Sequence, residues 1–167
     1  MGKTEDNVRA AFAGESQANR RYLFFAEKAD TEGYPQIAKL FRAVADAETI
    51  HAKNHLKVLD EIGSTSDNLS SAINGESYEY TTMYPEFIKQ AEEDGNQTAK
   101  RSFDLANQVE QIHHKLFQTM LSKVNAKDAI DAQPVYVCQV CGYTVEGEAP
   151  DRCPVCGAPV KMFKEVE

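Results

Sequence analysis

Two Glu-x-x-His motifs carry the strongest chemical signal in this sequence of 167 residues. They are Glu48 with His51 and Glu110 with His113, and both lie in segments of helical periodicity. Residues three positions apart share a face of a helix, so each glutamate points the same way as its histidine. One Glu from each of two helices, with Glu-x-x-His from each of two others, is the ligand set of di-iron and di-manganese carboxylate proteins.

Two further helical segments supply the remaining glutamates, Glu15 in the first and Glu76 and Glu79 in the third, which is one carboxylate more than this set requires. An ionised carboxylate on an apolar helix face costs roughly several kcal/mol unless it is paired or binds a cation. Oxygen-rich sites with a few imidazoles suit iron or manganese better than zinc. We therefore predict a site for two redox-active ions, which could supply the two electrons that cleavage of a peroxide O–O bond requires.

All four cysteines fall in two Cys-x-x-Cys pairs, Cys138 with Cys141 and Cys153 with Cys156, which are separated by eleven residues. A glycine follows each pair and permits the left-handed conformation in which backbone N–H groups approach the sulfurs. Four thiolates predict a tetrahedral metal site, which this geometry leaves open between zinc and iron. Two paired motifs argue against a redox dithiol.

Helices must position the carboxylates. Apolar residues recur at steps of three and four within residues 5–30, and the rhythm resumes at Pro35, which suits the first turn of a second helix ending near Gly63. Residues 64–75 are polar and rich in cap and turn formers, so we predict a long connection there.

The second half of the helical region repeats the pattern. We predict a third helix over residues 76–94, made irregular by Pro85, and a fourth from Ala99 to Val124 after a break at Gly95. Two helical hairpins joined by one long crossover predict an all-α, ferritin-like four-helix bundle.

An internal repeat supports two related hairpins. A shift of 62 residues superimposes identical residue types on the inward stripe and on both Glu-x-x-His motifs: Tyr22/Tyr84, Phe25/Phe87, Ala29/Ala91, Gly33/Gly95, Phe41/Phe103, Glu48/Glu110 and His51/His113. This indicates a duplicated hairpin. The same shift carries Glu15 onto Ser77, between Glu76 and Glu79. Either the third helix is irregular between Glu79 and Tyr84, or the equivalence of the ligands in the two halves is only approximate.

A second, small domain is predicted at the C-terminal end. Residues 131–167 are dotted with glycine and proline and contain every cysteine, and so short a piece needs a metal to hold it together. We therefore expect domains at residues 1–130 and 131–167.

Composition excludes several classes of protein. A net charge of −8 without a basic stretch argues against nucleic acid as the partner, and no GxGxxG motif marks a nicotinamide or flavin site. The longest apolar run, residues 22–26, is too short to cross a membrane. The first residues, MGKTED, lack the apolar core of a secretion signal, so we expect a cytoplasmic protein.

The combination of Glu-x-x-His helices with CxxCGY and CPxCG resembles the rubrerythrin family over essentially the full chain. The segments ESYE at residues 76–79 and MYPEF at residues 83–87 are similar to that family's third helix. Its second domain is rubredoxin-like, which favours iron over zinc at the four cysteines. The resemblance further implies that Glu48 and Glu110 bridge two irons, with Glu76 and His113 completing one of them.

For the other iron, the resemblance implies Glu15 and Glu79 as ligands, with His51 replacing Glu79 when the site is reduced. Tyr22 and Tyr84 match across the repeat and could donate hydrogen bonds to the site, although packing with a satisfied hydroxyl explains them equally well.

The family reduces hydrogen peroxide to water with electrons relayed through the rubredoxin-like iron, and it forms head-to-tail dimers. We therefore expect a peroxidase that protects against oxidative stress, with two Fe ions in the bundle and one at the cysteines. Zinc or manganese could replace iron. An external NAD(P)H-dependent reductase or rubredoxin would supply electrons, and the protein would be a homodimer or a larger homo-oligomer.

Two other functions, iron oxidation and a non-catalytic role, account for less of the pattern. A ferroxidase takes electrons from ferrous iron, so an appended electron-transfer domain has no use there. A non-catalytic protein with structural zinc would leave the second carboxylate of the third helix, Glu79, unexplained.

Overall fold

The computed structural model describes residues 2–167, and the chain divides into two units, residues 1–63 and residues 64–167. Among the described residues, none of the helices combines the length and apolar character that crossing a membrane requires.

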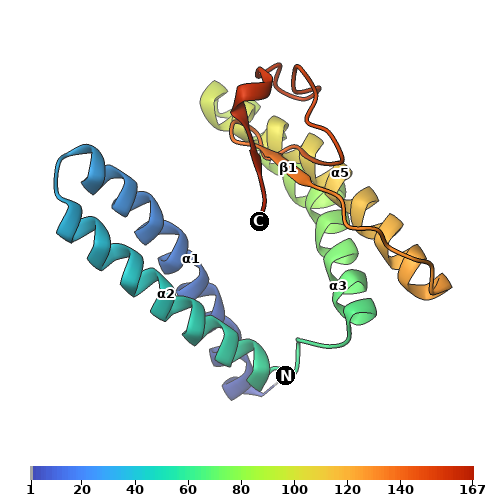
Figure 1. Ribbon diagram of the computed structural model, residues 1–167. Coiled ribbons are helices and arrows are strands. Elements are labelled where there is room, and N and C mark those ends of the chain that lie inside the picture. Colours follow the sequence, from blue (N-terminus) through green and yellow to red (C-terminus); the bar gives the residue numbers. More distant parts are fainter. Residues whose placement is uncertain (1) are drawn as a thin grey trace. The chain divides into compact units, whose positions relative to one another are not determined.

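The first unit is a helical hairpin of α1 (Lys3–Thr31) and α2 (Pro35–Val58), drawn in blue and teal in Figure 1. Its centre is built from small residues, Ala26, Ala29 and Ala38, which are at most 6% exposed and let the two helices approach closely. Gly33 makes the turn at φ +82°, and the Tyr34 N–H then donates to the Ala29 carbonyl over 2.8 Å.

The second unit contains a longer hairpin. Its first arm is α3 (Thr65–Tyr78), the π-helical turn η1 (Glu79–Met83) and α4 (Tyr84–Glu93), and its second arm is α5 (Gln97–Ala126). The turn between the arms repeats that of the first unit: Gly95 has φ +68°, and the Asn96 N–H donates to the Ala91 carbonyl over 2.8 Å. The two turns agree with the hairpin duplication inferred from the sequence.

The connection predicted over residues 64–75 is wrong, because most of that segment is the helix α3. Ser64 and Asp67 form a capping box in which the serine side chain accepts the Asp67 N–H and the aspartate accepts the Ser64 N–H. The polar residues therefore begin a helix, as cap formers do. The second helix also ends earlier than predicted, at Val58 rather than near Gly63.

The irregularity predicted between Glu79 and Tyr84 is confirmed as the π-helical turn η1. A π turn accommodates one extra residue within a helix. Glu15 precedes Tyr22 by seven positions, whereas Glu76 precedes Tyr84 by eight, and η1 absorbs the difference. Pro85 follows in the first turn of α4, where its missing N–H is tolerated.

Deleting Thr82, an exposed residue of η1, should therefore be tolerated because the π turn would relax to an ordinary α turn. The matched control deletes Arg20, the exposed residue of α1 that the repeat aligns with Thr82. That deletion should rotate Ala26 and Ala29 about 100° out of the hairpin core and cost several kcal/mol. Thermal unfolding of both variants checks this, and equal damage in the two would contradict the one-residue insertion.

The C-terminal residues form a three-stranded antiparallel sheet in the order β2-β1-β3. The strands are β1 (Val135–Cys138), β2 (Thr144–Glu146) and β3 (Phe163–Glu165). The buried residues of this part are Cys138, Cys153 and Ala158, so its centre is largely the cysteine cluster itself. This part, shown in red, lies alongside α5 in Figure 1, and α5 contacts β2. Whether residue 131 marks a domain boundary stays a prediction.

Candidate metal centres

The first unit carries one group of three candidate ligands, Glu15 on α1 with Glu48 and His51 on α2. His51 Nδ1 lies 2.8 Å from a Glu48 carboxylate oxygen and 3.8 Å from one of Glu15. The Glu48 side chain is 15% exposed and that of His51 is 54% exposed. One ligand atom from each residue can be chosen so that all lie within 4.8 Å of one another.

The second unit carries a matching group, Glu76 on α3 with Glu110 and His113 on α5. His113 Nδ1 lies 2.8 Å from Glu110 and 3.8 Å from Glu76, the same two distances as in the first group. The His113 side chain is more enclosed than that of His51, at 25% exposed. The duplicated hairpin thus presents the same three-residue arrangement twice, once in each unit.

Partly buried like charges shape the electrostatics of the second group. Burial raises the pKa of Glu76 to about 7, and the neighbouring Glu110 carboxylate adds to the rise. Burial also acts to raise the pKa of Glu110, but hydrogen bonds from His113 and Glu76 outweigh it and lower that pKa. The hydrogen bond to Glu110 raises the pKa of His113. A bound cation would offset the repulsion between the Glu76 and Glu110 carboxylates.

Glu79 and Tyr84 lie close enough to the second group for its charges to act on them. Burial and the charge of Glu110 raise the pKa of Glu79, and the charge of His113 opposes them only in part. Burial likewise raises the pKa of Tyr84, with contributions from the nearby carboxylates. Tyr84 also packs against Phe103, and Tyr22 packs on Phe41, with ring centroids 6.2 and 6.1 Å apart. Both tyrosine rings therefore pack against aromatic neighbours, and hydrogen-bond donation by their hydroxyls to the metal groups stays a prediction.

The four cysteines converge as predicted. Sγ of Cys138 lies 3.7 Å from that of Cys156, and Sγ of Cys141 lies 3.5 Å from that of Cys153. Four sulfurs about 2.3 Å from one ion in a tetrahedron are about 3.8 Å apart, so the spacing suits a metal. Burial raises the pKa of Cys141, which leaves the cation as the partner that stabilises its thiolate.

The two cysteine loops have the same backbone conformation. The glycines that follow them, Gly142 and Gly157, have φ values of +86° and +76°, which confirms the left-handed conformation predicted there. Each glycine N–H donates to the carbonyl of the first cysteine of its pair over 2.9 Å.

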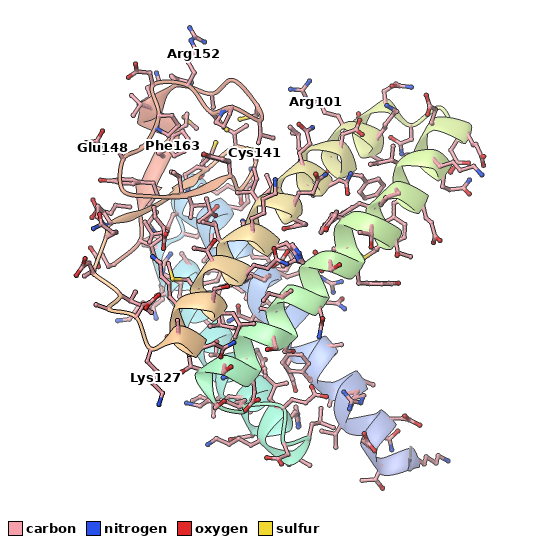
Figure 2. The ribbon with its side chains drawn as sticks, turned by 90° about the vertical axis from the view of Figure 1, so that its right-hand side faces the viewer. Arg101, Lys127, Cys141, Glu148, Arg152 and Phe163 are labelled. Atoms are coloured by element: carbon pink, nitrogen blue, oxygen red, sulfur yellow. The ribbon has the colours of Figure 1, made fainter. Side chains whose placement is uncertain are left out.

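A contact that the sequence did not reveal joins the cysteine loop to α5. His113 Nε2 lies 3.0 Å from the Thr144 hydroxyl and 3.3 Å from the Gly142 carbonyl oxygen. Val109, one turn before His113 and 2% exposed, lies 3.8 Å from the position that a Cβ at Gly142 would take. Figure 2 shows Cys141 on the side of the cysteine domain that faces α5.

The donor atoms of these groups fit iron. Carboxylate oxygens with one imidazole per group suit an iron pair, and four thiolates suit a single iron ion. Glu76 Oε2 is buried and has no hydrogen-bond partner in the described part of the chain, as expected of an oxygen whose partner is a cation.

The chain is similar to known proteins over nearly its whole length. Residues 6–121 match the family model Rubrerythrin, and residues 136–164 match the model Rubrerythrin, rubredoxin-like domain. Rubrerythrin-2 of Clostridium acetobutylicum is 41% identical, over 96% of this chain and 95% of that protein. Nigerythrin of Nitratidesulfovibrio vulgaris is 37% identical, over 98% of this chain and 86% of that protein.

Solved structures agree. The partially reduced state of nigerythrin matches with a TM-score of 0.60 and 35% identity, covering 99% of this chain and 88% of that chain. The fully reduced, all-ferrous state of nigerythrin gives the same values. Together the matches confirm the predicted fold class, a ferritin-like helical bundle followed by a rubredoxin-like domain.

Proposed function

Because this chain belongs to the rubrerythrin family, we propose that it is a peroxidase that reduces hydrogen peroxide to water and so protects the cell against oxidative stress. The family is one of oxidoreductases with a di-iron site and a rubredoxin-like Fe(Cys)4 site, and the chain holds ligands for both. The observation that supports the proposal most directly is the pair of matching Glu–Glu–His groups, with the four-cysteine site in contact with the second of them.

The iron pair would be held by five carboxylates and two imidazoles: Glu15, Glu48, His51, Glu76, Glu79, Glu110 and His113. By family resemblance, Glu48 and Glu110 would bind both ions, and His51 and Glu79 would be alternative ligands of one of them. The exposure of His51 gives its ring room to move, whereas His113 is held at both nitrogens. Iron bound there would supply the two electrons that, with two protons, convert one hydrogen peroxide to two waters.

This chain's own residues would handle peroxide and its protons. Glu79 is a part-buried carboxyl whose raised pKa allows it to hold a proton near the site. Tyr84 lies close enough to the carboxylates for their charges to act on its hydroxyl, and its raised pKa keeps the hydroxyl protonated as a donor. We propose the same role for Tyr22 in the first hairpin.

Electrons would reach the iron pair through the cysteine domain. The four cysteines would hold the iron that passes electrons inward. Gly142 directly follows the ligand Cys141, and its carbonyl lies 3.3 Å from His113 Nε2, so few bonds separate one set of ligands from the other. The electrons would come from an external NAD(P)H-dependent reductase or a rubredoxin. We also propose that the protein is cytoplasmic and that it forms a head-to-tail homodimer or a larger homo-oligomer.

A coupled assay tests this function. The iron-loaded protein, an NADH-dependent rubredoxin reductase and hydrogen peroxide are mixed without dioxygen, and NADH oxidation is followed together with peroxide loss. The proposal predicts one NADH oxidised per peroxide consumed and no dioxygen released. Peroxide loss without NADH oxidation, or accumulation of ferric mineral from added ferrous iron, would instead support a catalase-like or ferroxidase activity.

A further inference from the structure

The hydroxyl of Thr144 occupies a specific position between the cysteine domain and α5. Thr144 is the first residue of β2, two residues after Gly142, and its Oγ1 lies 3.0 Å from the Gly142 carbonyl oxygen and 3.0 Å from His113 Nε2. A hydroxyl has a single proton. Because the carbonyl can only accept, that proton goes to Gly142, and the lone pairs of Oγ1 are left to accept from His113.

This arrangement requires a proton on Nε2 of His113, since Nε2 donates to Thr144. Nδ1 hydrogen-bonds Glu110, and once it gives up its proton it would present its lone pair to a metal. Nδ1 is the ring nitrogen nearer to the carboxylates, 2.8 Å from Glu110 and 3.8 Å from Glu76. The orientation that satisfies Thr144 is therefore the one in which His113 can bind a metal together with both glutamates.

The first unit supplies an internal comparison. His51 has the same two distances from its glutamates, yet its Nε2 makes no hydrogen bond within the described residues. Its side chain is 54% exposed, compared with 25% for His113. The two groups share ligand chemistry and spacing, and they differ in what holds the far side of the imidazole.

We propose that Thr144 is a positioning residue, whose hydroxyl holds His113 with Nδ1 toward the carboxylates and so couples metal binding at the Glu76, Glu110 and His113 group to the ordered cysteine domain. The inference rests on the assignment of His113 as a ligand in the proposed function. It does not depend on the substrate, because the step concerned is metal binding.

The coupling follows from how Thr144 is held. The loop before it carries two of the four cysteines, Cys138 and Cys141, and the cysteine cluster forms most of the buried centre of this domain. A cation at the cysteines therefore orders the loop and places the hydroxyl that orients His113. Coupling of this kind is reciprocal, so an ion at the carboxylates also favours the ordered loop. Partners that orient a ligand in this way typically contribute about 10- to 100-fold in metal affinity.

Metal titration of the full-length protein tests the proposal. The cysteine site is first filled with one equivalent of Zn²⁺, which thiolates prefer, and Co²⁺ is then titrated anaerobically by calorimetry and visible absorption. Thr144→Val keeps the branched shape and removes the hydroxyl, whereas Thr144→Ser keeps the hydroxyl. We expect Thr144→Val to weaken one Co²⁺ step by about 10- to 100-fold, and Thr144→Ser to bind as the wild type does.

A second readout separates positioning from a general loss of structure. Nitrogen NMR of the Zn²⁺-loaded protein should show Nε2 of His113 protonated in the wild type and in Thr144→Ser, and Nε2 protonated in only part of the molecules in Thr144→Val. Unchanged Co²⁺ affinity in Thr144→Val overturns the proposal, as does equal weakening in both variants. Failure of peroxidase activity alone would refute the proposed function and leave this inference standing, whereas unchanged Co²⁺ binding in His113→Ala would refute the ligand assignment beneath both.

Discussion

Replacing Cys138 with serine is expected to abolish repeated peroxide turnover while leaving one oxidation of the chemically reduced protein intact. Cys138 is 1% exposed, and its sulfur is one of the four that converge. Without it the Fe(Cys)4 site cannot form, so electrons from the reductase have no route to the iron pair. Steady-state NADH oxidation should fall to background, and single-turnover oxidation by hydrogen peroxide after reduction with dithionite should keep its wild-type amplitude.

The matched control for this variant is Val140→Ser, which places serine in the same loop between the two cysteines. Val140 is 52% exposed and provides no ligand, so turnover with the reductase should remain near the wild-type rate. Dithionite reduces the iron pair directly and so bypasses the cysteine site. A wild-type amplitude in that single turnover would also show that Cys138→Ser is folded. Normal NADH-dependent turnover in Cys138→Ser would contradict the relay.

Replacing Glu110 with glutamine is expected to remove two iron ions per chain while leaving the cysteine-bound ion in place. The Glu110 side chain is 15% exposed, lies 2.8 Å from His113 Nδ1 and is hydrogen-bonded to Glu76. An amide keeps the shape but cannot supply the negative charge or bridge two cations as a carboxylate does. Peroxidase activity should fall by at least about 100-fold. Iron analysis with absorption and Mössbauer spectroscopy distinguishes the two kinds of site.

Glu86→Gln is the control for charge alone. Glu86 is an exposed glutamate of α4, and it lies outside the three candidate metal groups. That variant should keep full iron content and activity. An iron-loaded, fully active Glu110→Gln protein would refute the role of Glu110 as a bridging ligand.

The sequence predicted the chemistry well because the chemistry is local or repeated. Glutamate and histidine three residues apart share a helix face whatever the rest of the fold does, and the structure gives both motifs the same 2.8 Å contact. The mismatch of Glu15 with Ser77 in the repeat was also informative, because an extra residue must be absorbed somewhere, and η1 absorbs it.

Two features could not be predicted in this way. The polar run that begins at Ser64 contains residues that favour both turns and helix N-termini. In the structure the capping box of Ser64 with Asp67 stabilises the first turn of a helix there. The contact of Thr144 with His113 joins residues 31 positions apart, on a strand and a helix. No periodicity encodes such a contact, since it depends on how the cysteine loop packs against α5.

The most direct test of the central claim is anaerobic stopped-flow oxidation of the fully reduced, iron-loaded protein by hydrogen peroxide and, in parallel, by dioxygen. The absorption of the cysteine-bound iron and that of the iron pair are followed together. The peroxidase assignment predicts fast oxidation by peroxide at both sites and much slower oxidation by dioxygen. Faster oxidation by dioxygen, or oxidation of the iron pair without any response at the cysteine site, would contradict it and favour an iron-oxidising function.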